Sequence, residues 1–103
     1  MTADAEATRL LALSPLDGRY AARLDDLRPW LSELGLIRQR VVVELRWFAA
    51  LADEPAIAEV PALSPGARAL LSAIEREFSP ADAAAIRAIE ARTNHDVKAV
   101  EYW

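Results

Sequence analysis

The sequence has no cysteine, one histidine and three glycines among its 103 residues. The absence of cysteine excludes disulfide frameworks and thiolate metal ligands, and it is compatible with a reducing compartment. A single histidine also argues against a metal site of the usual kind, which combines several histidine or cysteine ligands. No phosphate-binding loop, dinucleotide-binding glycine pattern or nucleophile elbow is present. The sequence therefore does not indicate any of the enzyme classes that these motifs mark.

The sequence also has no long hydrophobic run and no block of basic residues. Its uncharged apolar runs are much shorter than the ~20 residues that span a bilayer, and Asp4 and Glu6 stand where a signal peptide would be basic. Acidic residues outnumber basic ones by 16 to 12, and the charges are mixed along the chain. We therefore expect a soluble cytoplasmic protein that binds neither nucleic acid nor membrane. Binding of an anionic small molecule by a few basic side chains is still compatible with this composition.

The residues that are abundant favour helices joined by short loops. Ala, Leu, Ile and Val dominate, and most of the 6 prolines fall between stretches of helical periodicity. The predicted fold class is all-α, with short helices around one long helix that is apolar on two sides. We expect a flexible N-terminus over residues 1–13, a helical domain over 14–93, and the start of a further helix over 94–103.

The long helix is predicted over residues 34–52, with Ser32 as its N-cap. Two apolar stripes recur along it at steps of three and four residues, so it should be covered on two sides. Gly35 indicates either close packing or the weak first turn of the helix. The first stripe holds Leu34, Ile37, Val41, Leu45, Phe48 and Ala52, and the second holds Leu36, Val43, Trp47 and Ala50.

Four shorter helices are predicted around it. One runs from about residue 21 to 28 and ends near Pro29. Ser64-Pro65 opens another, with a core stripe that continues to Phe78. Ser79 and Asp82 form a capping box for a helix that ends by Arg92 or Thr93. Asn94 then appears as the N-cap of a last helix of about two turns, too short to be stable alone. We therefore expect this chain to be the front piece of a longer polypeptide.

Two polar clusters could carry chemistry. Asn94, His95 and Asp96 would place helix N–H groups and an imidazole beside an anionic ligand, although a surface helix start with an incidental histidine is the simpler interpretation. Arg19 and Tyr20 follow the tight turn at Asp17-Gly18, where a guanidinium could hold phosphate or carboxylate. An ordinary turn with an exposed arginine is the alternative interpretation.

Four further basic residues have structural interpretations. Lys98 lies one turn beyond Asn94 and would suit a bound anion, but a solvated lysine is the simpler interpretation. The other three stand on the polar strip of the long helix and indicate pairing between helices or subunits instead of catalysis. They are Arg38, Arg40 and Arg46.

Three segments, in this order, resemble one enzyme family: "SPLDGRY" at 14–20, "LIRQRVVVELRWFAAL" at 36–51 and "RTNHDVKAVEYW" at 92–103. Together they are similar, over residues 10–103, to bacterial members of the adenylosuccinate lyase family in the fumarase/aspartase superfamily. The resemblance implies a helical N-terminal domain of such a lyase. The implied reaction is β-elimination of fumarate from N6-succinyl-AMP, giving AMP, and from SAICAR, giving AICAR, in purine biosynthesis. No metal or organic cofactor is implied.

The same resemblance implies roles for five residues. Arg19 and Tyr20 match family residues that hold the nucleotide near its phosphate. Asn94, His95 and Asp96 match a substrate-contacting segment, in which the histidine orients the substrate or assists proton transfer. The family's principal acid, a histidine, and its base, a serine on a mobile loop, lie further along the family's chain. Since family members are homotetramers that build each active site from three subunits, we expect these 103 residues alone to be inactive.

Two alternatives stay open. A free-standing helical interaction module would use the doubly apolar helix to bind a partner and would have no catalytic activity. A stop codon directly after Trp103 in the native reading frame would favour it. A piece produced by truncation or proteolysis, with structure but no function, is the other alternative.

Overall fold

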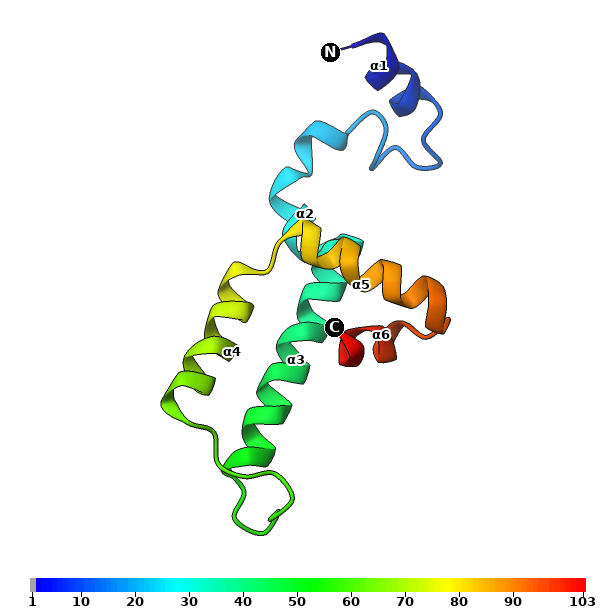
Figure 1. Ribbon diagram of the computed structural model, residues 1–103. Coiled ribbons are helices and arrows are strands. Elements are labelled where there is room, and N and C mark those ends of the chain that lie inside the picture. The colour runs from blue at the N-terminus through cyan, green and yellow to red at the C-terminus, as the bar shows by residue number, and fades with distance from the viewer. Residues whose placement is uncertain (1) are drawn as a thin grey trace. The chain divides into compact units, whose positions relative to one another are not determined.

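The computed structural model describes residues 2–103 and contains only helices and loops within that range (Figure 1). The all-α prediction is confirmed. None of these helices has both the length and the apolarity needed to cross a membrane. The chain divides into two compact units, one up to Gly35 and one from Leu36, and the predicted division after residues 13 and 93 stays a prediction. The elements are α1 (Ala3–Leu10), η1 (Ala21–Arg23), η2 (Asp25–Leu27), α2 (Arg28–Leu31), α3 (Glu33–Asp53), α4 (Pro65–Glu77), α5 (Pro80–Thr93) and α6 (Asp96–Tyr102).

Helix α1 lies in the segment for which the sequence predicted no regular element. Thr2 caps it by accepting a hydrogen bond from the backbone N–H of Ala5 at 3.2 Å. Asp4 and Glu6 stand in its first turn and Arg9 in its last, which complements the helix dipole at both ends. These signals are present in the sequence, but α1 has only 8 residues and buries none of them, so no apolar stripe reveals it.

The helix predicted from residue 21 to 28 is wrong. Two short 3-10 turns, η1 and η2, occupy that range, and Pro29 lies in the first turn of α2 instead of ending a helix. A proline is tolerated there because the first N–H groups of a helix have no intrahelical partner. Pro29 therefore marks the beginning of a helix, whereas the sequence analysis took it for the end of one.

The predicted cap of the long helix is confirmed. The Ser32 hydroxyl accepts from the backbone N–H of Gly35 at 3.1 Å and donates to the carbonyl of Arg28. A Cβ atom on Gly35 would lie 2.7 Å from the carbonyl oxygens of both Pro29 and Trp30. Gly35 thus marks close backbone packing between α2 and the start of α3, one of its two interpretations.

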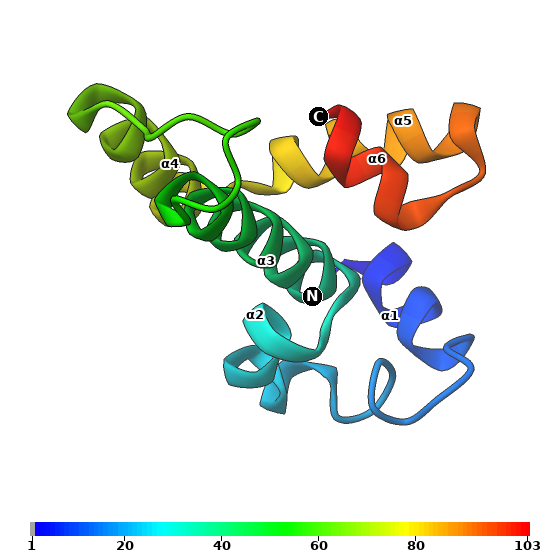
Figure 2. The same cartoon turned by 90° about the horizontal axis from the view of Figure 1, so that it is seen from below.

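In the second unit, α3 and α4 lie side by side and antiparallel (Figures 1 and 2). Arg46 pairs with Glu75 at 2.7 Å, and Asp53 near the end of α3 pairs with Arg68 near the start of α4. The predicted start of α4 is confirmed, because the Ser64 hydroxyl accepts from the N–H of Ala67 at 3.1 Å. No side chain of α4 is fully buried, so these ion pairs and half-buried contacts hold the hairpin.

Helices α5 and α6 lie against each other, joined by a short turn (Figures 1 and 2). The predicted capping box is confirmed: the N–H of Asp82 donates to the Ser79 hydroxyl, and the N–H of Ser79 donates to the Asp82 carboxylate. The Trp103 ring packs edge-on against Phe78, with 5.6 Å between centroids. The buried side chains of this unit come from α3, α5 and α6: Ile37, Val41, Val42, Ala52, Ala83, Ile86, Ala99 and Val100.

The first apolar stripe of α3 is largely covered, apart from the exposed Phe48, whereas the second is exposed. Ile37, Val41 and Ala52 of the first stripe are buried, but Val43 and Trp47 of the second are 63% and 60% exposed. Within residues 2–103 the helix is therefore covered on one side only, and cover of its second side stays a prediction. At 100° per residue the two stripes point in opposite directions, and the second unit covers only one of them. Such a contiguous apolar face is typical of an interaction surface.

We expect the 103-residue chain to self-associate through the second stripe. Replacing Trp47 by Glu places a charge in that face and should weaken self-association by roughly tenfold or more, since a buried aromatic contributes about 1.5–3 kcal/mol. Sedimentation velocity over a concentration series measures the effect. The matched control is Ala84→Glu on the exposed side of α5. A wild-type chain that stays monomeric at every concentration would contradict the expectation.

Candidate functional site

The five predicted site residues fall in two different units. Arg19 and Tyr20 belong to the first unit, whereas Asn94, His95 and Asp96 belong to the second. Each group stands in or directly beside a connection between helices, where binding residues are commonly found, and Asp96 is the first residue of α6. We describe them as the first and the second corner.

The first corner is a compact turn over residues 14–20. The Pro15 carbonyl accepts from the N–H of Gly18 at 3.3 Å and from the N–H of Tyr20 at 2.9 Å. The Ser14 carbonyl accepts from the N–H of Asp17 at 3.2 Å, and the Ser14 hydroxyl accepts from the N–H of Leu16. The turn therefore satisfies its backbone groups locally, as the Pro and Asp-Gly signals predicted.

Arg28 fastens this turn to the following helical segment. Its Nη1 donates to Asp17 at 2.9 Å, its Nη2 to the carbonyl of Ala21 at 2.8 Å, and its Nε to Asp25 at 3.0 Å. The hydrogen bond to Asp17, followed by that to Asp25, raises the pKa of the guanidinium above its ordinary value. The planar guanidinium binds all three acceptors at once through separate nitrogens, which the single nitrogen of a lysine could not do in the same geometry. The sequence did not identify this role, because no local pattern links residues 17 and 28.

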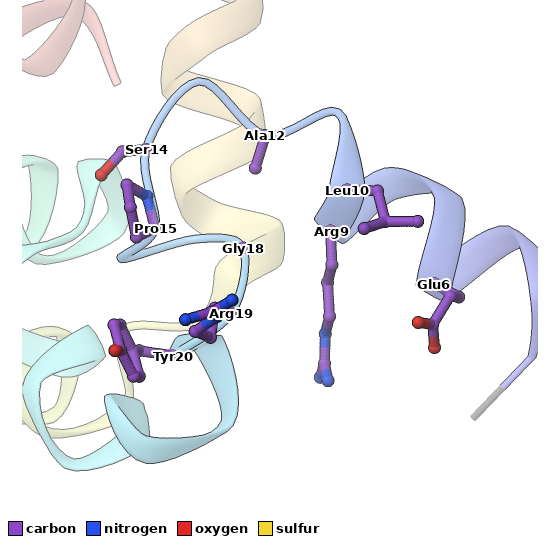
Figure 3. Close-up of a pocket in the computed structure, with 9 residues that line it drawn as sticks. All are labelled: Glu6, Arg9, Leu10, Ala12, Ser14, Pro15, Gly18, Arg19 and Tyr20. Atoms are coloured by element: carbon purple, nitrogen blue, oxygen red, sulfur yellow. The ribbon is translucent and has the colours of Figure 1, made fainter.

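An open hollow of about 600 Å³ lies beside the turn. Figure 3 shows Arg19 and Tyr20 on the turn, with Glu6 and Arg9 extending from α1. Among residues 2–103, no hydrogen-bond or ion-pair partner faces the guanidinium of Arg19 or that of Arg9. The corner can therefore offer unpaired positive charge. That Arg19 and Tyr20 bind a substrate stays a prediction.

The second corner corrects the predicted role of Asn94. Asn94 ends α5 in the left-handed conformation, with φ of 52°, and its N–H donates to the Glu90 carbonyl at 2.8 Å. It is not the N-cap of the last helix. Asparagine tolerates this conformation better than most residues do, so its presence fits a helix end as well as a helix start.

His95 is the N-cap of α6. The Nδ1 atom of its ring accepts a hydrogen bond from the backbone N–H of Lys98 at 3.1 Å. The backbone N–H of His95 donates to the Thr93 hydroxyl at 3.3 Å. Because Nδ1 acts as an acceptor, the proton of the neutral ring resides on Nε2. Histidine is not among the preferred N-caps, which is why the sequence pointed to Asn94.

Asp96 is held from two directions. Its Oδ1 accepts from the N–H of Val97 at 2.9 Å, and its Oδ2 pairs with Arg40 of α3 at 2.8 Å. The Val97 N–H, and secondarily the charge and hydrogen bond of Arg40, lower the pKa of the carboxyl below its ordinary value against an opposing effect of burial. The predicted inter-helix pairing is confirmed for Arg40 and Arg46.

These contacts change what the second corner can offer a ligand. Side chains of the corner already occupy the N–H groups of Val97 and Lys98, so the expectation that these groups face a ligand is wrong. The exposed groups are the His95 ring, the Asn94 amide and the Lys98 ammonium, which lies 5.9 Å from the centroid of the Tyr102 ring. Within residues 2–103 no three acidic or histidine side chains gather as a metal site would require. The corner is suited to binding and orienting.

We expect acid to release the Asp96 carboxylate from Arg40 and from the Val97 N–H. Because its pKa lies below the usual value of about 3.9, the stabilisation is complete above that pH and is lost as the pH falls through the lower folded-state value. The Val97 amide proton, followed by NMR, should shift only below about pH 4, the usual range of an aspartate. Asp96→Asn should abolish this shift and Asp4→Asn should not. A Val97 transition above pH 4 would contradict the assignment.

No family model matches the chain. Among curated proteins, the adenylosuccinate lyases of Vibrio cholerae, Haemophilus influenzae and Escherichia coli K12 are 51%, 52% and 52% identical to it. Each alignment covers 98 residues, which is 95% of this chain and 22% of the relative. The chain thus spans about a fifth of the length of these relatives. Over nearly all its residues the chain is thus similar to part of the adenylosuccinate lyases, and the resemblance carried by its three segments is confirmed.

Proposed function

We propose that this chain supplies part of the substrate site of an adenylosuccinate lyase. The activity is β-elimination of fumarate from N6-succinyl-AMP and from SAICAR, in purine biosynthesis in the cytoplasm, by a homotetramer that needs no cofactor. The observation that carries the proposal is identity of about half over 98 residues with relatives of that name. The acid and base of the elimination belong to parts of the family outside these 98 residues. The comparisons give no support to a free-standing interaction module.

The first corner is proposed to hold the phosphate of the nucleotide through Arg19. Asp17, two positions away, already pairs with Arg28 at 2.9 Å, so it does not neutralise Arg19. An exposed guanidinium on a rigid turn can present its planar fork to a phosphate at little entropic cost. Tyr20, 42% exposed beside it, offers a hydroxyl and a ring face. These features support a binding role, with no proton transfer at this corner.

At the second corner, His95 is proposed to orient the substrate. Its Nδ1 is engaged by the Lys98 N–H, so the ring presents Nε2 as a hydrogen-bond donor to an anionic oxygen. Accepting a proton at Nδ1 would break the cap of α6. The cap therefore favours a positioning role over one as a base that takes its proton at Nδ1.

Asn94 and Asp96 are proposed to support the same corner. The left-handed backbone of Asn94 sets the direction in which the chain enters α6. Asp96 anchors the first turn of α6 to α3 through Arg40. Direct contact of either side chain with the substrate stays a prediction, and for Asp96 such contact would have to share a carboxylate that already has two partners.

We expect Arg19→Ala to lower kcat/KM by roughly a hundredfold, because a charge-assisted contact to the phosphate is lost. The test uses a hybrid enzyme in which this segment replaces the 98 aligned residues of the Escherichia coli relative. Fumarate release from N6-succinyl-AMP is followed by absorbance. The control is Arg23→Ala, which removes an exposed arginine of the same unit outside the hollow. Wild-type rates for Arg19→Ala would refute the assignment.

His95 needs a variant that keeps the cap. Asparagine is a preferred N-cap residue, so His95→Asn should retain α6 but lose the imidazole, whereas His95→Ala loses both. We expect both hybrids to lose roughly a hundredfold or more in kcat/KM, with the Asn variant keeping wild-type thermal stability. If the His95→Asn hybrid kept the kcat/KM of the wild-type hybrid, the histidine would serve only as the N-cap of α6.

A further inference from the structure

We propose that Arg9 supplies a second guanidinium to the anion that Arg19 binds, so that the hollow of the first unit is a two-arginine site for a phosphate monoester. The inference rests on the proposed function of Arg19 and adds a residue that lies outside the three segments that suggested the family. The ligand class follows from the charge and the donors that line the hollow.

The backbone brings the two arginines to one hollow. A Cβ atom on Gly18 would lie 2.8 Å from the carbonyl oxygen of Arg9, so the turn packs directly on the last turn of α1. Gly18 is buried, and the next residue in the chain is Arg19. Both arginines line the hollow of about 600 Å³ (Figure 3). The close approach at Gly18 therefore fixes Arg9 beside the turn.

The charges around the hollow do not cancel. Among residues 2–103, neither Arg9 nor Arg19 has an ion-pair partner, and Glu6 is the one acidic residue among those lining the hollow. The nearby carboxylates of Asp17 and Asp25 are both bound by Arg28. Two guanidinium groups that share a hollow repel each other, and a doubly negative phosphate between them would reverse the sign of that interaction.

The rim adds neutral donors that suit the same ligand. The Ser14 hydroxyl accepts from the N–H of Leu16 at 3.2 Å, which leaves its own proton available to donate. Tyr20 lines the hollow as well and is partly exposed. Arginine forks with hydroxyl donors are a common means of holding phosphate oxygens. A carboxylate ligand would use fewer of these groups.

The experiment is a titration of the 103-residue chain with inorganic phosphate and with AMP at constant ionic strength, followed by the Nε–H NMR signals of arginine. Adenosine serves as the uncharged probe. Arg9→Gln and Arg19→Gln should each weaken phosphate binding by roughly tenfold. Arg9→Lys should fall between wild type and Arg9→Gln, because it keeps the charge and loses the fork. Arg23→Gln is the matched control, with the same charge change outside the hollow.

Glu6→Gln tests the sign of the electrostatics. Removing the one carboxylate that lines the hollow should strengthen phosphate binding, by a few-fold for an exposed pair of charges. A loss of affinity in this variant would overturn the proposal. Far-UV circular dichroism confirms that α1 persists in each variant, since Gln and Arg have similar helix propensities.

The outcomes separate this inference from the proposed function. If Arg19→Gln weakens binding and Arg9→Gln behaves like Arg23→Gln, the role of Arg9 is refuted while that of Arg19 stands. If the wild-type chain binds no phosphate, or neither arginine affects binding, the two-arginine site is refuted. If both arginines matter here but Arg19→Ala leaves the hybrid enzyme fully active, the site stands and the lyase assignment of Arg19 fails.

Discussion

The second unit depends on α3, because its other helices are too short to persist alone. Helices α4, α5 and α6 have 13, 14 and 7 residues, and isolated helices shorter than about 12–15 residues are marginal in water. Helix α3 supplies four of the eight buried apolar side chains and three ion-pair partners for α4 and α6. The pair between Arg40 and Asp96 holds α3 to the short helix that His95 caps, so it positions the proposed substrate-orienting residue.

Five arginines of this chain illustrate two situations, one in which the guanidinium is paired within the fold and one in which it is unpaired beside a hollow. Arg28, Arg40 and Arg46 each bind a carboxylate within 3.0 Å, so their positive charge is neutralised by ion pairs within the fold. Arg9 and Arg19 have no such partner within residues 2–103 and share one hollow. Binding an anion needs uncompensated positive charge, because a paired guanidinium would have to lose one partner to gain another. The sequence alone does not show which of these five guanidinium groups are paired, and the structure does.

The sequence predicted best where the physical cause is local. The caps at Ser32, Ser64 and Ser79 were found because each hydrogen bond spans three residues. It failed at Pro29, which suits a helix beginning as well as an end, and at Asn94, where two adjacent polar residues compete for one cap. The cover of α3 and the partners of Arg28 depend on residues distant in sequence, which periodicity cannot reveal. For the site, the resemblance indicates which residues are involved, but the contacts that orient them join residues that no sequence motif links.

The N-cap at His95 also limits the chemistry available to the ring. A histidine on a flexible surface would lose rotational freedom when it bound a substrate, which lowers affinity. Here the Nδ1 hydrogen bond and the Arg40–Asp96 pair fix the ring and the first turn of α6 before any ligand arrives. The ring is therefore pre-organised to donate from Nε2. A proton added at Nδ1 would break this hydrogen bond and remove the cap of α6. Fixed direction and one available donor are the properties of a group that positions a substrate.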